Sequence, residues 1–329
     1  MRSPDFWHRD GLLPRLLSPL GALYAAAGRR RRLSVTPNRL GIPVLCVGNL
    51  TAGGSGKTPT VLALCARLRA RGIDVHLLSR GHGGRLTGPH RVDPARDAAV
   101  DVGDEPLLLA AAAPAWISRD RAAGGRAAEA AGAGLVIMDD GFQNPGLAKD
   151  LSLLVFDQAV GIGNGRVHPA GPLREPAAEG LARAQGLVVT RTEARPDLSR
   201  LPSLPADLPV LTALLSPALP AQRLAGARAL AFAGIGRPAR FFETCQAVGL
   251  QLVGTRAFPD HHRYDPDEIM NLVEQAARAD AILLTTSKDR ARLPAEARPM
   301  VEVLEVELVF DDAERLDALL APLAPTGAS

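Results

Sequence analysis

The glycine-rich stretch at residues 44–59 contains the side chains best suited to chemistry. It reads VLCVGNLTAGGSGKTP, so an apolar run leads into a turn that ends in Gly56, Lys57 and Thr58, and an apolar-periodic helix follows. Backbone N–H groups of such a turn and helix N-terminus bind phosphate oxygens, while a lysine neutralises charge and a threonine hydroxyl ligates Mg²⁺. The strict pattern G-x-x-x-x-G-K-[ST] is not met, because Thr51 stands where its first glycine belongs. The stretch still predicts a nucleotide phosphate site.

A second candidate for chemistry is the carboxylate pair Asp139 and Asp140, which follows the apolar run at 135–138. A buried strand that ends in carboxylates can hold Mg²⁺ opposite bound phosphates when it ends where a glycine-rich turn opens. By itself, an Asp-Asp-Gly sequence after a strand is more often a plain turn. Together with Lys57 and Thr58 upstream, the metal interpretation is favoured, and Thr58 is a further expected ligand.

The strands that must position these groups are mostly unbroken apolar runs, and helical patterns lie between them. Unbroken rather than alternating runs favour a parallel sheet covered on both faces. We therefore expect an α/β fold with a P-loop NTPase-like, doubly wound, mainly parallel sheet and a second, smaller α/β lobe. The expected strands are 43–48, 74–79, 134–139, 151–157, 186–190, 229–233, 281–286 and 301–307, and the expected helices are 59–71, 105–113, 120–131, 239–248 and 267–278.

Domain organisation is indicated by length and by one proline-rich stretch. With 329 residues, 47% of them hydrophobic, the chain is long enough for about two domains. Residues 194–227 carry repeated prolines that break any long helix, so we expect the change from the first lobe to the second there. The expected units are 1–32, a membrane-interface helix with its basic flank; 33–200, the P-loop core; and 201–329, the C-terminal α/β lobe.

The N-terminal segment has the pattern of an interfacial membrane helix. Its apolar run at 16–28 is shorter than the roughly 20 residues that span a bilayer. The basic cluster at 29–32 follows the run, which is not the order of a signal peptide. Apolar residues with Trp7 and Tyr24 at headgroup level, and arginines facing anionic lipid, fit an interfacial helix. The alternative is an ordinary amphipathic helix that covers the core, followed by a solvated basic turn.

Composition argues against other function classes. The net charge of +3 and the pI near 9.0 are mild, and two Trp, two Tyr and eight Phe leave little for base stacking, so no nucleic-acid partner is expected. Cys46, Cys65 and Cys245 are isolated and lack C-x-x-C spacing. This fits packed thiols in a reducing compartment better than disulfides or zinc. We expect a protein on the cytosolic side of the membrane.

Eight sequence blocks, in order, resemble those of the tetraacyldisaccharide 4'-kinase family, and together they cover nearly the whole chain. The blocks are VGNLTAGGSGKTP, LSRGHGG at 78–84, GDEP at 103–106, DDGFQ at 139–143, GNGRVHPAGPLREP at 163–176, FAGIGRP at 232–238, FPDHHRY at 258–264 and TTSKD at 285–289. The resemblance implies MgATP-dependent phosphorylation of the 4' hydroxyl of an acylated glucosamine disaccharide 1-phosphate, giving lipid IVA. It also implies a P-loop kinase core at 33–200, a peripheral location on the cytoplasmic face of the inner membrane, and no obligate protein partner.

The resemblance also implies roles for particular residues. Asp104 and His261 match a dyad in which the carboxylate takes the sugar hydroxyl proton with the help of the histidine. Arg80 and Arg121 match arginines near phosphate or lipid substrate. The residues matching the ATP loop are Gly53, Gly54, Ser55, Gly56, Lys57 and Thr58, and those matching the magnesium site are Thr58, Asp139, Asp140 and Glu175.

Several of these residues have simpler interpretations. Asp104, followed by Glu105 and Pro106, suits a helix N-cap. His261 has His262 beside it, and the family's Asp-His order selects His261. The remaining simple interpretations are a surface ion pair of Arg174 with Glu175, solvated loop charges at Lys288 and Asp289, and core packing of Cys46.

Two positions depart from the family pattern. His82 stands where many members have a tyrosine after Arg-Gly, and Asn144 replaces a common histidine after DDGFQ. We expect substrate contacts near these positions to differ, whereas the reaction class does not depend on them.

The runner-up function is a membrane-associated P-loop ATPase of the partitioning type, which uses ATP as a dimerisation switch. Such proteins carry a lysine before the two glycines, where this chain has Ala52, and their membrane helix is usually C-terminal. A third interpretation, a non-catalytic nucleotide-binding scaffold, is opposed by the number of charged residues outside the loop.

Overall fold

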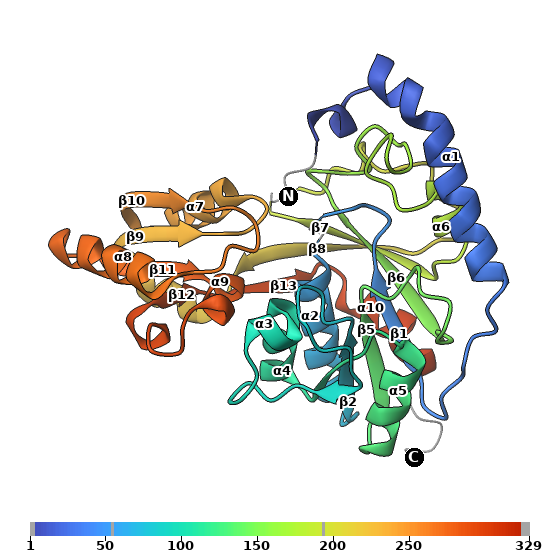
Figure 1. Cartoon of the computed structure of the whole chain (residues 1–329), viewed down its shortest axis with the longest axis horizontal. Coiled ribbons are helices and arrows are strands. Elements are labelled where there is room, and N and C mark those ends of the chain that lie inside the picture. The colour runs from blue at the N-terminus through green and yellow to red at the C-terminus, as the bar shows by residue number, and fades with distance from the viewer. Residues whose placement is uncertain (1–3, 54–55, 193–194, 324–329) are drawn as a thin grey trace.

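A nine-stranded sheet forms the larger part of the molecule (Figure 1). The computed structural model describes residues 4–53, 56–192 and 195–323. Neighbouring strands are parallel except at the two edges, where β3 and β13 are antiparallel. In spatial order the strands are β13 (Val306–Phe310), β8 (Val210–Pro217), β7 (Gly186–Arg191), β6 (Leu151–Asp157), β1 (Val44–Gly48), β5 (Leu135–Asp139), β2 (Val75–Ser79), β4 (Ala115–Ile117) and β3 (His90–Arg91).

A second, four-stranded parallel sheet forms the smaller lobe, at the left of Figure 1. Its spatial order is β10 (Gln251–Ala257), β9 (Arg228–Ala233), β11 (Ile282–Thr286) and β12 (Glu302–Leu304). Helix α7 (Pro238–Ala247) packs on one face through Phe241 and Cys245. Helix α8 (Pro266–Arg278) packs on the other through Ile269 and Leu272. The smaller sheet is therefore covered on both faces.

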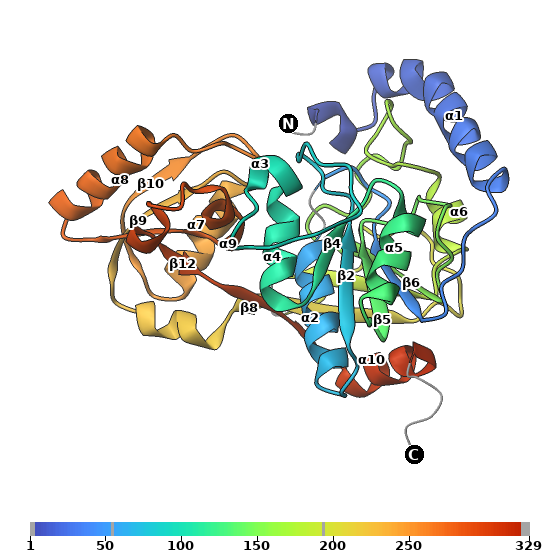
Figure 2. The same ribbon diagram turned by 60° about the horizontal axis from the view of Figure 1, so that its bottom comes forward.

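The remaining helices surround the larger sheet or connect its strands. They are α1 (Leu12–Leu33), α2 (Lys57–Arg69), α3 (Ala99–Val102), α4 (Asp104–Ala112), α5 (Arg121–Ala130), α6 (Ala177–Leu181), α9 (Ser287–Arg292) and α10 (Ala313–Leu320), with short 3₁₀ helices at Asp5–His8, Leu219–Leu224, Arg298–Met300 and Ala321–Leu323. Helix α4 of the larger lobe packs against α9 of the smaller lobe, and Figures 1 and 2 both show α9 on the side of the smaller lobe that faces α4.

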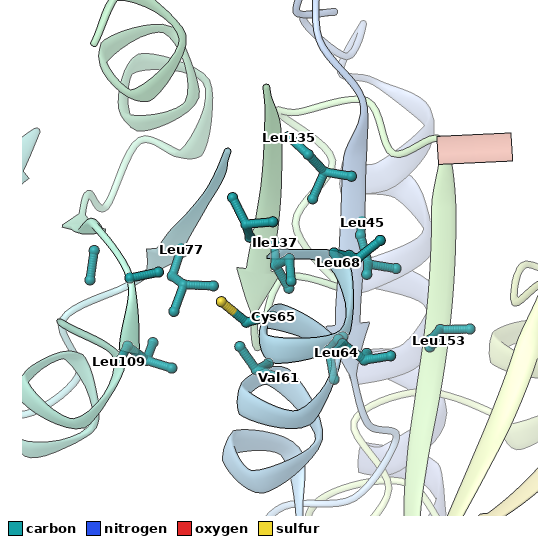
Figure 3. Packing of buried hydrophobic residues seen from close by; sticks show 14 of the residues in the cluster. Leu45, Val61, Leu64, Cys65, Leu68, Leu77, Leu109, Leu135, Ile137 and Leu153 are labelled. Atoms are coloured by element: carbon teal, nitrogen blue, oxygen red, sulfur yellow. The ribbon is translucent and has the colours of Figure 1, made fainter. Parts of the chain in front are cut away.

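Alternate side chains of the central strands enter two separate cores. Leu45 of β1 and Ile137 of β5 pack under α2, α4 and α10, whereas Cys46 and Met138 point to the other face, which α5 and α6 cover. In Figure 3, side chains of α2, among them Leu64, face the sheet. Truncating a buried leucine of this kind to alanine typically costs about 2–5 kcal/mol. The unbroken apolar runs follow from burial on both faces, and the prediction that Cys46 is a core residue is confirmed.

Helix α1 lies along the outer edge of the larger lobe (Figures 1 and 2). It approaches the loop after β6 so closely that a Cβ on Gly21 would lie 2.8 Å from the carbonyl oxygen of Val167. Among the helices of the described residues, none combines the length and apolar character needed to cross a membrane. Away from this contact α1 is largely exposed, and its exposed large apolar side chains are Leu12, Leu13, Leu16, Leu20, Leu23, Tyr24 and Leu33.

The expected α/β class and mainly parallel sheet are confirmed, but sheet membership does not follow a division at residue 200. β8 and β13 lie beyond that residue and still extend the larger sheet. The single strand expected at 301–307 is wrong, because β12 ends at Leu304 and β13 starts at Val306 in a different sheet. The chain thus leaves the larger sheet after β8 and returns to it with β13. The unit boundaries at 32 and 200 remain predictions.

Candidate active site

The glycine-rich turn joins the central strand β1 to helix α2. Gly56 precedes α2 with a φ of +82°, and a Cβ there would lie 2.8 Å from the hydroxyl oxygen of Thr190. Only glycine fits both the conformation and the space. Gly53 also has a positive φ, of +114°. Gly54 and Ser55 lie outside the described residues, so their expected role stays a prediction.

Lys57, the first residue of α2, faces the carboxylate of Asp140. The Nζ of Lys57 lies 3.8 Å from Asp140 Oδ1, which also accepts a 2.8 Å hydrogen bond from Arg174. Burial opposes ionisation of Asp140, but the charges of Lys57 and Arg174 outweigh it and hold the pKa of this carboxyl below its ordinary value. A charged Asp140 therefore lies beside the lysine that a nucleotide phosphate would contact.

Asp139 is a buried carboxylate without a hydrogen-bond partner. It ends β5 with 1% of its surface exposed, and neither side-chain oxygen has a partner among the described residues. Burial, together with the negative charge of Glu105, raises the pKa of Asp139 to about 7. Because an unpaired buried carboxylate is costly, a cation at this position would stabilise it. Thr58, also buried, begins α2 beside Lys57.

Glu175 differs from Asp139 because its oxygens are occupied by protein donors. It accepts hydrogen bonds of 3.0 and 2.9 Å from Arg183 and one of 3.1 Å from Gln143, and it pairs with Arg32 at 3.2 Å. The surface ion pair with Arg174 is wrong, because Glu175 is buried and Arg174 donates to a different carboxylate. No group of three or more His, Cys, Asp or Glu side chains within the described ranges is placed to hold a metal ion.

Asp104 and His261 come from different lobes and meet at the start of α4. Asp104 Oδ2 lies 3.2 Å from the Nδ1 of His261. The N-cap interpretation of Asp104 is wrong, because Gly103 occupies the N-cap and α4 has no side-chain cap. His262 instead pairs with Glu268 at 2.7 Å. The structure thus brings together the two residues that the family resemblance selects.

The charges of this pair reinforce each other. Burial alone would raise the pKa of Asp104, but the bond to His261 and the charge of Arg292 hold it well below its ordinary value. The bond to Asp104 raises the pKa of His261. The pair therefore carries a carboxylate that stays ionised next to an imidazole that binds a proton more readily.

Helix α9 supplies residues that sequence reasoning missed. Arg292, 5% exposed at its side chain, donates from Nε to Asp104 Oδ2 at 2.9 Å and from Nη1 to Asp289 at 3.0 Å. Lys288 donates to Glu105 at 2.6 Å. The solvated-loop interpretation of Lys288 and Asp289 is therefore wrong.

One sequence signal could have located this helix. Thr286 caps the helix and Asp289 stands three residues later, a pattern typical of helix starts. A helix beginning there places Lys288 and Arg292 on one face.

The two expected arginines have different surroundings. Arg80 is exposed just after β2. Arg121 is buried at the start of α5, its Nη1 donates to the carbonyl of Ser118, and its Nε has no partner among the described residues. Burial lowers the pKa of Arg121 to about 10. Of the two departures from the family pattern, His82 lies beside His261, with ring centroids 6.4 Å apart.

A parallel sheet whose central strand runs into a glycine-rich turn and a helix, with a buried carboxylate ending the adjacent strand, is the architecture of P-loop kinases. Within that class the chain belongs to the tetraacyldisaccharide-1-P 4'-kinase family, whose model matches residues 13–324. The family assignment made from sequence is confirmed. The partitioning-type ATPase is not favoured.

Individual relatives agree over nearly the full length. Tetraacyldisaccharide 4'-kinase of Rhodospirillum centenum is 55% identical, over 98% of this chain and 97% of that protein. The enzyme of Rhodospirillum rubrum with the same name is 52% identical, over 97% of each. The crystal structure of LpxK from Aquifex aeolicus in complex with ATP is similar with a TM-score of 0.78 and 28% identity, over 95% of this chain and 99% of that chain.

Proposed function

We propose that this protein transfers the γ-phosphate of ATP to the 4' hydroxyl of a tetraacylated glucosamine disaccharide 1-phosphate, giving lipid IVA. The observation that carries this proposal is the pairing of Asp104 with His261 across the two lobes. A switch ATPase activates only water, whereas a kinase needs a carboxylate that receives an acceptor hydroxyl. Helix α4, which begins at Asp104, packs against α2, which begins at Lys57. This packing supports an acceptor pair close to the phosphate loop.

The phosphate end of the site would use Lys57, Thr58 and Asp139. The turn that ends at Gly56 directs backbone N–H groups of α2 toward the phosphates, and Lys57 neutralises their charge. The orphaned oxygens of Asp139 and the hydroxyl of Thr58 fit Mg²⁺, which typically takes one or two carboxylates together with phosphate oxygens and water. When bound, Mg²⁺ neutralises charge on the transferring phosphoryl group.

The acceptor end would use Asp104 and His261. Phosphoryl transfer passes through a loose transition state in most analyses, so the acceptor hydroxyl needs positioning more than early proton removal. A carboxylate with a lowered pKa suits this task, because it accepts a hydrogen bond throughout and the proton only as the new P–O bond forms. His261 and Arg292 fix the orientation of Asp104 Oδ2.

Helix α1 would bring this site to its lipid. Six leucines of this helix are exposed, and Arg30 and Arg31 are exposed at its C-terminal end. Burial of apolar side chains with electrostatic attraction to anionic lipid supports binding at the cytoplasmic face of the inner membrane. Trp7, expected at headgroup level, instead donates to the carbonyl of Pro169 at 3.1 Å, so only part of the expected aromatic contact is available.

The test is transfer of labelled phosphate from γ-labelled ATP to tetraacyldisaccharide 1-phosphate in mixed micelles. The chain should give a phosphorylated lipid, and Lys57→Ala should lower the rate by about 10²- to 10³-fold because an oriented charge contact to the transferring group is lost. ATP hydrolysis that is stimulated by membranes but leaves the lipid unlabelled would instead support the switch ATPase.

A further inference from the structure

We propose that Arg32, the penultimate residue of α1, is a positioning residue for the phosphate site and acts through Glu175. This inference rests on the proposed function, since it concerns the same site. The side chain of Arg32 is 17% exposed, whereas that of Arg29, one turn earlier, is 57% exposed. Arg32 thus points into the protein from a helix on which most of the leucines are exposed.

Arg32 makes two ionic contacts with the kinase core. Its Nη1 lies 3.2 Å from Glu175 Oε2, and its Nη2 donates to Glu179 Oε2 at 3.0 Å. The side chain of Glu175 is 1% exposed. Charge-assisted contacts to a buried carboxylate are stronger than exposed ones, because little water competes for them. The end of α1 is therefore attached to the core mainly at Glu175.

A continuous set of polar contacts leads from Glu175 to the phosphate loop. Glu175 Oε1 accepts from Gln143 at 3.1 Å, and the Oε1 of Gln143 accepts from Arg174 at 3.5 Å. The same Arg174 nitrogen donates to Asp140 at 2.8 Å, and Asp140 faces Lys57 at 3.8 Å. Glu175 thus lies between the helix expected on lipid and the lysine expected on nucleotide.

Loss of Arg32 would not leave Glu175 without a counter-charge. Arg183 contacts both of its oxygens, at 3.0 and 2.9 Å. Without Arg32, Arg183 becomes the sole cation on this carboxylate, which is then free to move away from Gln143. We therefore expect altered positioning of the groups around Asp140 rather than unfolding.

The experiment compares Arg32→Gln with Arg29→Gln as a matched control. Arg29 lies on the same helix, but among the described residues its ionic partner is Glu179, at 3.6 Å, rather than Glu175. The first measurement is binding of a non-hydrolysable ATP analogue to each full-length protein in detergent without lipid substrate, over a range of Mg²⁺ concentrations. The second is kcat and KM for the lipid.

Arg32→Gln should weaken Mg²⁺-dependent binding of the analogue by about 10-fold, which is typical for the loss of a side chain that orients metal-ligating residues. Its kcat should fall without a matching rise in the KM for lipid. Arg29→Gln should bind the analogue like the unmodified protein. Arg32→Lys should recover part of the loss, since an ammonium group restores the charge but does not form the two-fold contact of a guanidinium.

Equal analogue binding by the unmodified protein, Arg32→Gln and Arg29→Gln would overturn the proposal. If Arg32→Gln does not fold by thermal unfolding, Arg32→Lys decides, and unchanged binding in that variant is again contrary to the proposal. Failure of the proposed function is distinguishable, because a protein that leaves the lipid unlabelled can still show the Arg32 effect on analogue binding.

Discussion

Replacing Asp104 with asparagine tests the acceptor site most directly, because it removes one charge and keeps the shape. In the structure Asp104 is buried, contacts His261 at 3.2 Å and accepts from Arg292 at 2.9 Å. Both partners contact the same oxygen, Oδ2, so an amide oxygen in that place can still accept from both, but it lacks the negative charge that strengthens these bonds. The substitution therefore affects stability and chemistry by amounts that can be separated.

The stability cost can be worked out from the partners that remain. Removing one member of a buried ion pair typically costs about 3–5 kcal/mol. Arg292 still donates to Asp289 and to the carbonyl of Gly234, so the cost should be lower, about 2 kcal/mol, in the range of a single hydrogen bond to a charged group. Since domains are typically stable by about 5–15 kcal/mol, the variant should remain folded. Loss of the carboxylate should lower kcat by about 10²- to 10⁴-fold.

The assay measures lipid phosphorylation and denaturant unfolding on the same preparations of Asp104→Asn, His261→Ala, the double variant and the unmodified protein. If the two residues act as a unit, the double variant should have nearly the kcat of the worse single variant. A kcat per folded molecule close to normal in Asp104→Asn would refute the assignment. Independent, multiplicative effects on kcat would refute the dyad while leaving a separate role for each residue.

Three further variants test the site and the N-terminal helix. Asp139→Asn should lower transfer by about 10²- to 10³-fold. The same variant should stabilise the metal-free, nucleotide-free protein at neutral pH by at most about 4 kcal/mol, because the pKa rise from 3.8 to about 7 is removed and one pKa unit corresponds to about 1.4 kcal/mol; calorimetry that finds it less stable would contradict this. Because the pKa of His261 is raised in the folded protein, its pairing with Asp104 stabilises the fold fully below pH 6.5, the ordinary pKa of histidine, and this contribution is lost as the pH rises through the folded pKa. The unfolding temperatures of the unmodified protein and His261→Gln should therefore converge over that pH window. A difference that does not change with pH would argue against the ion pair. Deleting residues 1–32 should lower sedimentation with anionic vesicles, whereas unchanged sedimentation would support a helix that only covers the core.

Local sequence patterns were enough to predict the candidate site residues that lie at the end of a single strand. The turn before Lys57 follows the fully buried strand β1, and Asp139 and Asp140 stand at the end of the fully buried strand β5, so apolar runs and the residues at their ends were sufficient. The dyad of Asp104 and His261 required the family resemblance, because 157 positions of chain separate its members. No local pattern specifies which of two neighbouring histidines turns toward another lobe.

The missed features depend on tertiary contacts. β10 lies at the edge of its sheet and is largely exposed, so its sequence QLVGTRA lacks the continuous apolar run by which the expected strands were recognised. Asp289 is fully buried although its neighbours are charged, because Tyr264, Thr286 and Arg292 surround it. Glu175 was expected as a metal ligand. In the structure it pairs with two arginines, Arg183 and Arg32, and Arg32 lies far upstream in the sequence.

The return of the chain to the larger sheet through β13 has a consequence for biosynthesis. β8 pairs with β13 in antiparallel register, from Pro217 with Val306 to Ala213 with Phe310, and the smaller lobe lies between these strands in sequence. During translation, β8 therefore stays an unpaired edge until 88 more residues have emerged (306 minus 218). The smaller lobe can fold as a unit in that interval, since domains generally form in order of synthesis. Completion of the nucleotide-binding body, including the leucines of α10 that close its core, is thus among the last events of synthesis. Messages that are truncated late would yield chains with a finished smaller lobe and an exposed strand, which are substrates for aggregation or proteolysis rather than partly active enzymes.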